Sequence, residues 1–127
     1  MNKTILLTGV ILGCLAVIFG AFGAHGLEKL VDEKAVQTFN TGVKYQMYHA
    51  LLLLFLGVLA IPPQSKTWVF YLILAGVVLF SFSLYVLALD EVLGFNAKSL
   101  GIVTPFGGVL LIIGWMLLGH RIFKHFI

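Results

Sequence analysis

Residues 5–24 read ILLTGVILGCLAVIFGAFGA and carry no charged side chain. An α-helix needs about 20 mostly apolar residues to cross a hydrocarbon layer about 30 Å thick, so this run has the length of one membrane crossing. Three further uncharged, mostly apolar runs follow at residues 45–61, 68–89 and 101–119. We therefore predict four membrane-spanning helices, at about residues 5–24, 42–61, 68–89 and 102–119.

The overall composition leads to the same fold class. Hydrophobic residues make up 61% of the chain, charged residues only 10%, and the mean hydropathy is +1.09. A water-soluble chain of this size could not bury that much apolar surface in one core. Lipid offers no partner for backbone N–H and C=O groups, and the runs lack the alternation of barrel strands, so the spans must be helices. The sequence predicts an all-α integral membrane four-helix bundle with short loops, formed by residues 1–127 as a single domain.

The basic residues bear on partners and orientation. An even number of spans places both chain ends on one side of the membrane, side A, and the connections after the first and third spans on side B. Side A has Lys3, Lys66, Arg121 and Lys124; side B has Lys29, Lys34, Lys44 and Lys98, together with all five acidic residues, Glu28, Asp32, Glu33, Asp90 and Glu91. The bare count of basic residues is therefore a tie between the two sides, and acidic residues contribute little to topology. Because Lys44 lies at the start of a span and counts less than a loop lysine, we expect side A to be cytoplasmic. The scattered positions of the basic residues exclude a nucleic-acid partner and leave the lipid bilayer.

The connection after the first span admits two interpretations. Apolar residues recur there at helical spacing among charged ones, at Leu27, Leu30, Val31, Ala35 and Phe39. This pattern suits a short helix lying along the membrane interface. It equally suits an upstream extension of the second span that begins with Asp32 as its N-cap.

The other span boundaries carry clearer signals. Pro62 and Pro63 break the chain and predict a tight antiparallel hairpin between the second and third spans. Thr104 and Pro105 suit the N-cap and the first helical position of the fourth span. Aromatic residues near predicted span ends are typical of the membrane interface; they are Trp68, Tyr71 and Trp115.

Small residues form a stripe along the first span, at alternating steps of four and three: Gly9, Gly13, Ala16, Gly20 and Gly23. Helices in lipid associate through close packing, so the stripe marks where another backbone approaches. Packing against the protein's own spans is favoured over a homo-oligomer seam. Gly107 and Gly108 permit a similar approach in the fourth span, and we expect the first and fourth spans to touch.

Cys14 needs a separate interpretation. It follows an apolar run, as in a lipoprotein signal, but that run continues to Ala24 without the polar segment that such a signal precedes. We therefore expect Cys14 to be a small buried residue.

Polar residues within the spans gather in the side B half of the predicted bundle: His25, Gln46, His49, Ser81, Ser83, Tyr85 and Thr104. Polar groups in hydrocarbon are costly unless they are paired inside the bundle, so we predict a hydrogen-bonded cluster that serves either packing or a ligand. In a helix beginning near Thr41, His49 lies roughly 12 Å along the axis, inside the bilayer.

None of these residues forms a catalytic signature. Ser81 and Ser83 have no histidine or acid at motif spacing, so we predict no catalytic residue and no enzyme activity. A bridging role for neutral His49 is favoured over a ligand role, because a closed zinc site needs four ligands; we predict no metal site and no cofactor. His120 and His125, with Arg121 and Lys124, form a basic side A tail suited to anionic lipid headgroups.

Four segments together resemble a known family. They are GAFGAHGL at residues 20–27, TGVKYQMYHA at 41–50, LFSFSLY at 79–85 and GIVTPFGG at 101–108. In this order they are similar to domain-of-unknown-function family 423, small four-span proteins akin to the eukaryotic transmembrane protein 256. The resemblance implies a multi-pass protein of the bacterial plasma membrane. It supplies no activity and no catalytic residues, and at most an involvement in membrane integrity or stress tolerance.

Three functions fit these features. The favoured one is a non-enzymatic structural or accessory membrane protein that acts through oligomerisation, lipid contact or a partner. The second is a small transporter or channel with the polar cluster as its vestibule, although the spans lack the carboxylate on which proton-coupled exporters of this size rely. The third is haem, metal or quinone binding through His25 and His49.

Overall fold

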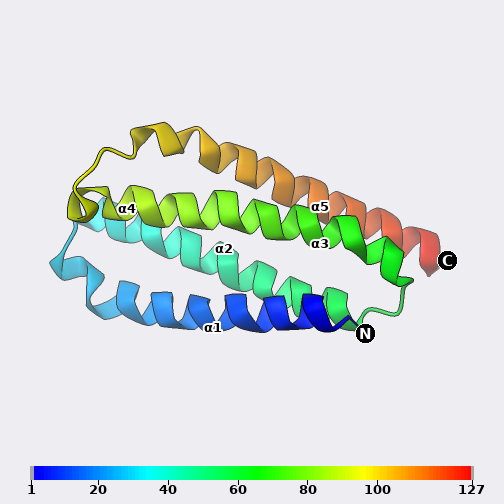
Figure 1. Ribbon diagram of the computed structural model, residues 1–127. Coiled ribbons are helices and arrows are strands. Elements are labelled where there is room, and N and C mark those ends of the chain that lie inside the picture. Colours follow the sequence, from blue (N-terminus) through cyan, green and yellow to red (C-terminus); the bar gives the residue numbers. More distant parts are fainter. Residues whose placement is uncertain (1, 127) are drawn as a thin grey trace.

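The computed structural model describes residues 2–126, and that part of the chain is helical, with no strand (Figure 1). Its long elements are α1 (Lys3–His25), α2 (Glu33–Val58), a third rod made of α3 (Pro63–Val77), the π-helical segment η2 (Val78–Phe82) and α4 (Ser83–Leu93), and α5 (Val103–His125). The short 3₁₀ turns η1 (Leu27–Lys29) and η3 (Lys98–Gly101) lie in the connections. The predicted all-α fold is confirmed.

The long helices run antiparallel, and both ends of the chain lie at the same end of the bundle (Figure 1). Helix α1 packs on α2, α2 packs on α3, η2 and α4, and α5 packs on α3 and η2. The expected contact between the first and fourth spans is wrong, because α1 and α5 are the outer helices of this arrangement. The small residues of α1 pack against α2 instead, and those of α5 pack against η2 and α3.

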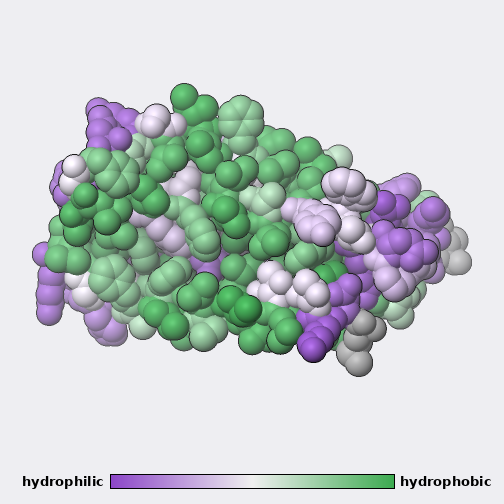
Figure 2. All heavy atoms as spheres, in the orientation of Figure 1, coloured by the Kyte–Doolittle hydropathy of each residue, from purple (hydrophilic) through white to green (hydrophobic). Residues whose placement is uncertain are grey.

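Three of the rods, Lys3–His25, Pro63–Leu93 and Lys98–His125, are long and apolar enough to cross a membrane. Helix α2 has a polar first half and an apolar second half. Because it contacts α1, α3, η2 and α4, its polar side chains can face protein rather than lipid. On the molecular surface, hydrophilic residues gather at the two ends and a broad hydrophobic belt lies between them (Figure 2).

The ends of the helices follow from local chemistry. Helix α2 begins at Glu33, and the Asp32 side chain accepts a hydrogen bond from the Ala35 N–H at 2.8 Å. Of the two interpretations of this connection, the upstream extension of the second span is thus correct. The only helical turn between α1 and α2 is the short 3₁₀ turn η1. Helix α4 ends at Gly94, whose φ of 82° lies in the left-handed region that favours glycine.

Two local expectations are wrong. Helix α5 begins at Val103 with Ile102 as its N-cap residue, so Thr104 does not cap it. The η3 turn precedes the helix directly, and the Thr104 hydroxyl bonds to Ser83 instead. Cys14 is exposed rather than buried, because it lies one position beyond the stripe that faces α2 and points outward.

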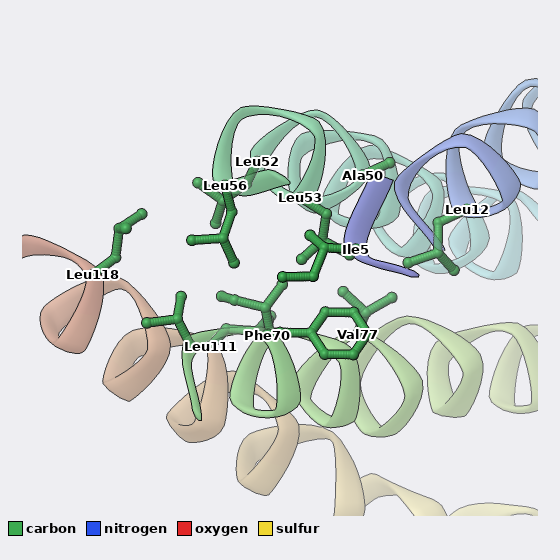
Figure 3. Packing of buried hydrophobic residues seen from close by; sticks show 12 residues of the cluster. Ile5, Leu12, Ala50, Leu52, Leu53, Leu56, Phe70, Val77, Leu111 and Leu118 are labelled. Carbon is green, nitrogen blue, oxygen red and sulfur yellow. The ribbon is translucent and has the colours of Figure 1, made fainter. Parts of the chain in front are cut away.

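The larger of two apolar clusters lies between α1, α2, α3 and α5 (Figure 3). Its fully enclosed side chains come from the apolar half of α2 and from the inner face of α3: Leu53, Leu56, Val69, Ile73 and Val77. Leu111 and Leu118 of α5 pack against the same cluster. A second apolar cluster, formed by Leu27, Phe39, Tyr85 and Ala88, joins η1, α2 and α4, and the Tyr85 hydroxyl of this cluster bonds to Gln46.

Candidate functional site

The stripe of small residues on α1 lies against α2. A Cβ atom on Gly9 would stand 2.9 Å from the carbonyl oxygen of Ala50, closer than real Cβ contacts allow. One on Gly23 would stand 3.2 Å from the ring of Phe39, and one on Gly20 would touch Val43 at 3.4 Å. The absence of side chains lets the two backbones come close enough for α2 side chains to reach main-chain groups of α1.

Gln46 is the residue that uses this proximity. Its Nε2 donates to the carbonyl oxygen of Leu12 at 2.8 Å, and its Oε1 accepts from the Tyr85 hydroxyl at 2.6 Å. Gln46 is 0% exposed, so both ends of its amide are satisfied inside the protein. One side chain therefore joins α1, α2 and α4.

One hydrogen bond and one close backbone approach join η2 and α4 to α2. The Ser81 hydroxyl donates to the carbonyl oxygen of Gly42 at 2.7 Å. A Cβ on Gly42 would stand 2.7 Å from the Tyr85 ring and 3.0 Å from the Ser81 carbonyl oxygen. Gly42 is thus the place on α2 where the third rod comes closest.

The π-helical segment also holds α5. The Ser83 hydroxyl lies 2.8 Å from the carbonyl oxygen of Phe80 and 2.6 Å from the Thr104 hydroxyl. The Thr104 hydroxyl also lies 3.4 Å from the carbonyl oxygen of Leu100, so each hydroxyl has a helix carbonyl as an acceptor and either one can donate to the other. Gly107 packs directly on the backbone of η2, with no room for a Cβ, whereas Gly108 leaves 3.7 Å to the Phe80 ring. These contacts fix where α5 begins its course along the bundle.

His49 links α2 to α5. Its Nδ1 lies 2.6 Å from the carbonyl oxygen of Tyr45, and its Nε2 lies 3.1 Å from the indole nitrogen of Trp115. A carbonyl only accepts and an indole N–H only donates, so the proton is on Nδ1, Nε2 is the acceptor, and the ring is neutral. Both ring nitrogens are occupied by protein groups.

A groove of about 390 Å³ opens beside His49 between α2, η2 and α5. Its walls are mostly apolar and aromatic, with Tyr45, Phe80, Leu111 and Trp115 among the lining residues. His49 also lines the groove, and its Nε2 accepts the Trp115 N–H. The groove therefore offers hydrocarbon contact and aromatic surface more than coordination chemistry.

The structure does not bring all the candidate residues together. Gln46, Ser81 and Tyr85 meet on α2, Ser83 and Thr104 pair between α4 and α5, and His49 pairs with Trp115. His25 lies exposed at the last residue of α1 and takes no part in these bonds. Within residues 2–126, no three or more His, Cys, Asp or Glu side chains group in a way that could hold a metal ion.

Two polar junctions at the end of the bundle that holds both chain ends were not predicted from the sequence. Lys66 is only 3% exposed, and its Nζ donates to the carbonyl oxygen of Gly57 at 3.1 Å. The same oxygen accepts the backbone N–H of Asn2 at 3.0 Å, which fastens the start of α1 to the end of α2. The Ser65 hydroxyl lies 3.0 Å from Nε2 of His125, between α3 and the last turn of α5. Asn2 and Gly57, like Ser65 and His125, are far apart in the sequence, so no sequence signal pairs them.

The site as a whole consists of polar side chains that bond helix to helix, in a bundle with an apolar belt. These features define a small helical membrane protein. The chain belongs to the family described as "Protein of unknown function (DUF423)", whose model matches residues 19–108. The resemblance seen in the sequence is thereby confirmed.

Relatives in bacteria match along nearly the whole chain. A UPF0382 membrane protein of Staphylococcus aureus is 41% identical over 123 residues, covering 96% of this chain and 97% of its own length. UPF0382 membrane protein YwdK of Bacillus subtilis is 44% identical over 119 residues, covering 91% and 93%. No solved structure matches the chain. These relatives are named as membrane proteins, and their names give no activity.

Proposed function

We propose that this protein is a non-catalytic structural or accessory protein of the bacterial plasma membrane that supports membrane integrity or stress tolerance. The observation that carries the proposal is how the polar groups of the bundle are used. Gln46, Ser81 and His49 each bond to a neighbouring helix. Groups bonded in this way hold helices together and are not presented to a substrate.

Four membrane crossings are part of the proposal. Helix α2 is more polar than the other rods, yet its buried Gln46 and His49 are satisfied by α1, α4 and α5. A central helix shielded by its neighbours can carry such residues through a bilayer. With four crossings, both chain ends lie on one side of the membrane, side A, and the reduced weight of Lys44 on side B supports a cytoplasmic side A.

The outer faces of α1 and α5 support an accessory role through association. Val10, Val17 and Ile18 are more than half exposed on α1, and Ile112 and Met116 are more than half exposed on α5. These faces are available to lipid, to a partner protein or to a second copy of the chain. The basic end of α5 adds a contact with anionic lipid.

The test is genetic complementation in the source bacterium. A strain that lacks the gene is expected to take up more propidium iodide after an osmotic downshift, and the wild-type gene is expected to restore the barrier. His49→Ala, expressed at the same folded abundance in the membrane, is expected to restore it too. An unchanged barrier in the deletion strain would overturn the proposal.

The same variant separates this function from the alternatives. If the protein is a transporter, His49→Ala abolishes a measurable flux in proteoliposomes while the fold is retained. If it binds haem, a metal or a quinone through His25 and His49, protein purified from its own membrane has a cofactor absorption band or bound metal that the variant loses. Either result would replace the structural function with a ligand-dependent one.

A further inference from the structure

The two ends of the bundle differ in charge. Side A carries basic residues without acidic ones, and side B carries every acidic residue of the chain together with lysines. Hydrophilic surface is visible at both ends (Figure 2), so the two ends differ in the sign of their charged side chains rather than in polarity. An end with only positive charge attracts the anionic headgroups of a bilayer.

The basic residues of side A are not equivalent. Lys66 is buried and bonds to the carbonyl oxygen of Gly57, so its donor capacity is partly used inside the fold. Lys124 is exposed near the end of α5. Arg121 lies one turn before His125, and its Nε is buried with no hydrogen-bond partner in residues 2–126. The Arg121 side chain as a whole is partly exposed, so its positive charge can still attract an anionic group from outside the chain.

The first turn of α3 adds to this positive end. No side chain caps α3, whose N-cap residue is Pro62, so the positive end of its dipole is not neutralised by the protein. The Ser65 hydroxyl contacts Nε2 of His125 at 3.0 Å, and this bond holds the last turn of α5 beside the first turn of α3. The helix dipole and the basic residues of α5 therefore act at one corner of the bundle.

We propose that this corner, formed by the first turn of α3 and the last two turns of α5, binds the phosphate of an anionic phospholipid in the side A leaflet. A guanidinium can hold a phosphate through two parallel N–H···O bonds, and Lys124 adds a second positive charge. Around α5, Lys124 lies between Arg121 and the outer face of the helix, where Phe123 and Met116 are each 69% exposed, so apolar surface for acyl chains begins beside Lys124. That continuity assigns the corner to a lipid rather than to free phosphate. The inference deepens the proposed function by naming the chemistry of a partner.

The experiment uses the full chain in nanodiscs of phosphatidylcholine, with or without phosphatidylglycerol, and counts retained lipids by native mass spectrometry. We expect phosphatidylglycerol to be retained in preference to phosphatidylcholine and to raise the Tm. The double variant Arg121→Gln/Lys124→Gln is expected to weaken that retention by about tenfold or more. The matched control Lys29→Gln/Lys98→Gln removes two side B charges and is expected to retain the lipid as the wild type does.

Three results would overturn this inference: equal losses in the two double variants, no preference for phosphatidylglycerol in the wild-type protein, or an equal rise in Tm from inorganic phosphate added to phosphatidylcholine discs. If the double variant does not fold, the wild-type comparison between the lipids and inorganic phosphate still decides. A protein without lipid preference would still be expected to restore the barrier in the deletion strain, so the proposed function stands or falls separately.

Discussion

The bond between Tyr85 and Gln46 provides a direct test of how the polar cluster stabilises the bundle. Tyr85→Phe removes the hydroxyl that donates to Gln46 Oε1 at 2.6 Å and keeps the ring that packs against Phe39 at 4.8 Å. Gln46 is 0% exposed, so its Oε1 is left without a donor in the interior. Leaving such an acceptor unsatisfied costs about 1–3 kcal/mol in soluble proteins, and interhelical bonds in membranes are worth up to about 1.7 kcal/mol. We expect Tyr85→Phe to lower the free energy of unfolding by about 1 kcal/mol.

A double-mutant cycle separates this bond from general packing. Gln46→Leu removes the same bond from the other side, together with the bond to the Leu12 carbonyl oxygen. We expect it to cost about 1–2 kcal/mol, and the double variant to cost about 1 kcal/mol less than the sum of the two single changes. The assay is reversible unfolding in mixed micelles, followed by tryptophan fluorescence.

The control for the cycle is Tyr48→Phe. Tyr48 is 55% exposed, so removing its hydroxyl is not expected to leave a buried acceptor without a donor, and the free energy of unfolding is expected to stay unchanged. Strictly additive effects of Tyr85→Phe and Gln46→Leu, or equal effects of Tyr85→Phe and Tyr48→Phe, would refute the reasoning that the cluster joins the helices.

Two adjacent glycines and the indole of Trp115 give further predictions. Gly107→Ala is expected to destabilise the bundle by about 1–3 kcal/mol, because its Cβ would meet the backbone of η2. Gly108→Ala is expected to be tolerated, so thermal unfolding should give the two variants different Tm values, and equal Tm values would contradict the prediction. Trp115→Phe leaves His49 Nε2 without its donor and is expected to cost about 1 kcal/mol. Trp68→Phe, at a residue that is 65% exposed, serves as its control in the same assay, and a loss as large as that of Trp115→Phe would contradict the role given to His49.

Much of the fold could be predicted because lipid imposes simple requirements on a sequence. A run such as residues 5–24 has to be a helix, and the two prolines at 62 and 63 require a hairpin. The sequence could not determine which helices are neighbours. The glycines of α1 and α5 are equally suited to meet each other, and only the shape of the whole bundle places α2 and η2 between them.

The candidate site was predictable in composition more than in its contacts. Gln46 lies early in the second span, and Ser81 and Tyr85 lie late in the antiparallel third span, so the sequence places all three in one half of the bundle. It does not reveal that the Gln46 amide joins three helices. Trp115 was interpreted as an interfacial aromatic residue, since nothing in its neighbourhood indicates His49 as its acceptor. The π-helical segment depends on contacts with α2 and α5, so no local pattern signals it.

Cysteine accessibility in inverted and right-side-out vesicles tests the four crossings most directly. In a Cys14→Ala background, single cysteines replace Gln64, Lys124, Lys29 and Asn96, all of which are exposed at the ends of the bundle. The account predicts that an impermeant maleimide labels positions 64 and 124 from one face and positions 29 and 96 from the other. Labelling of positions 29 and 64 from the same face would show that α2 does not cross the membrane, and would contradict the account.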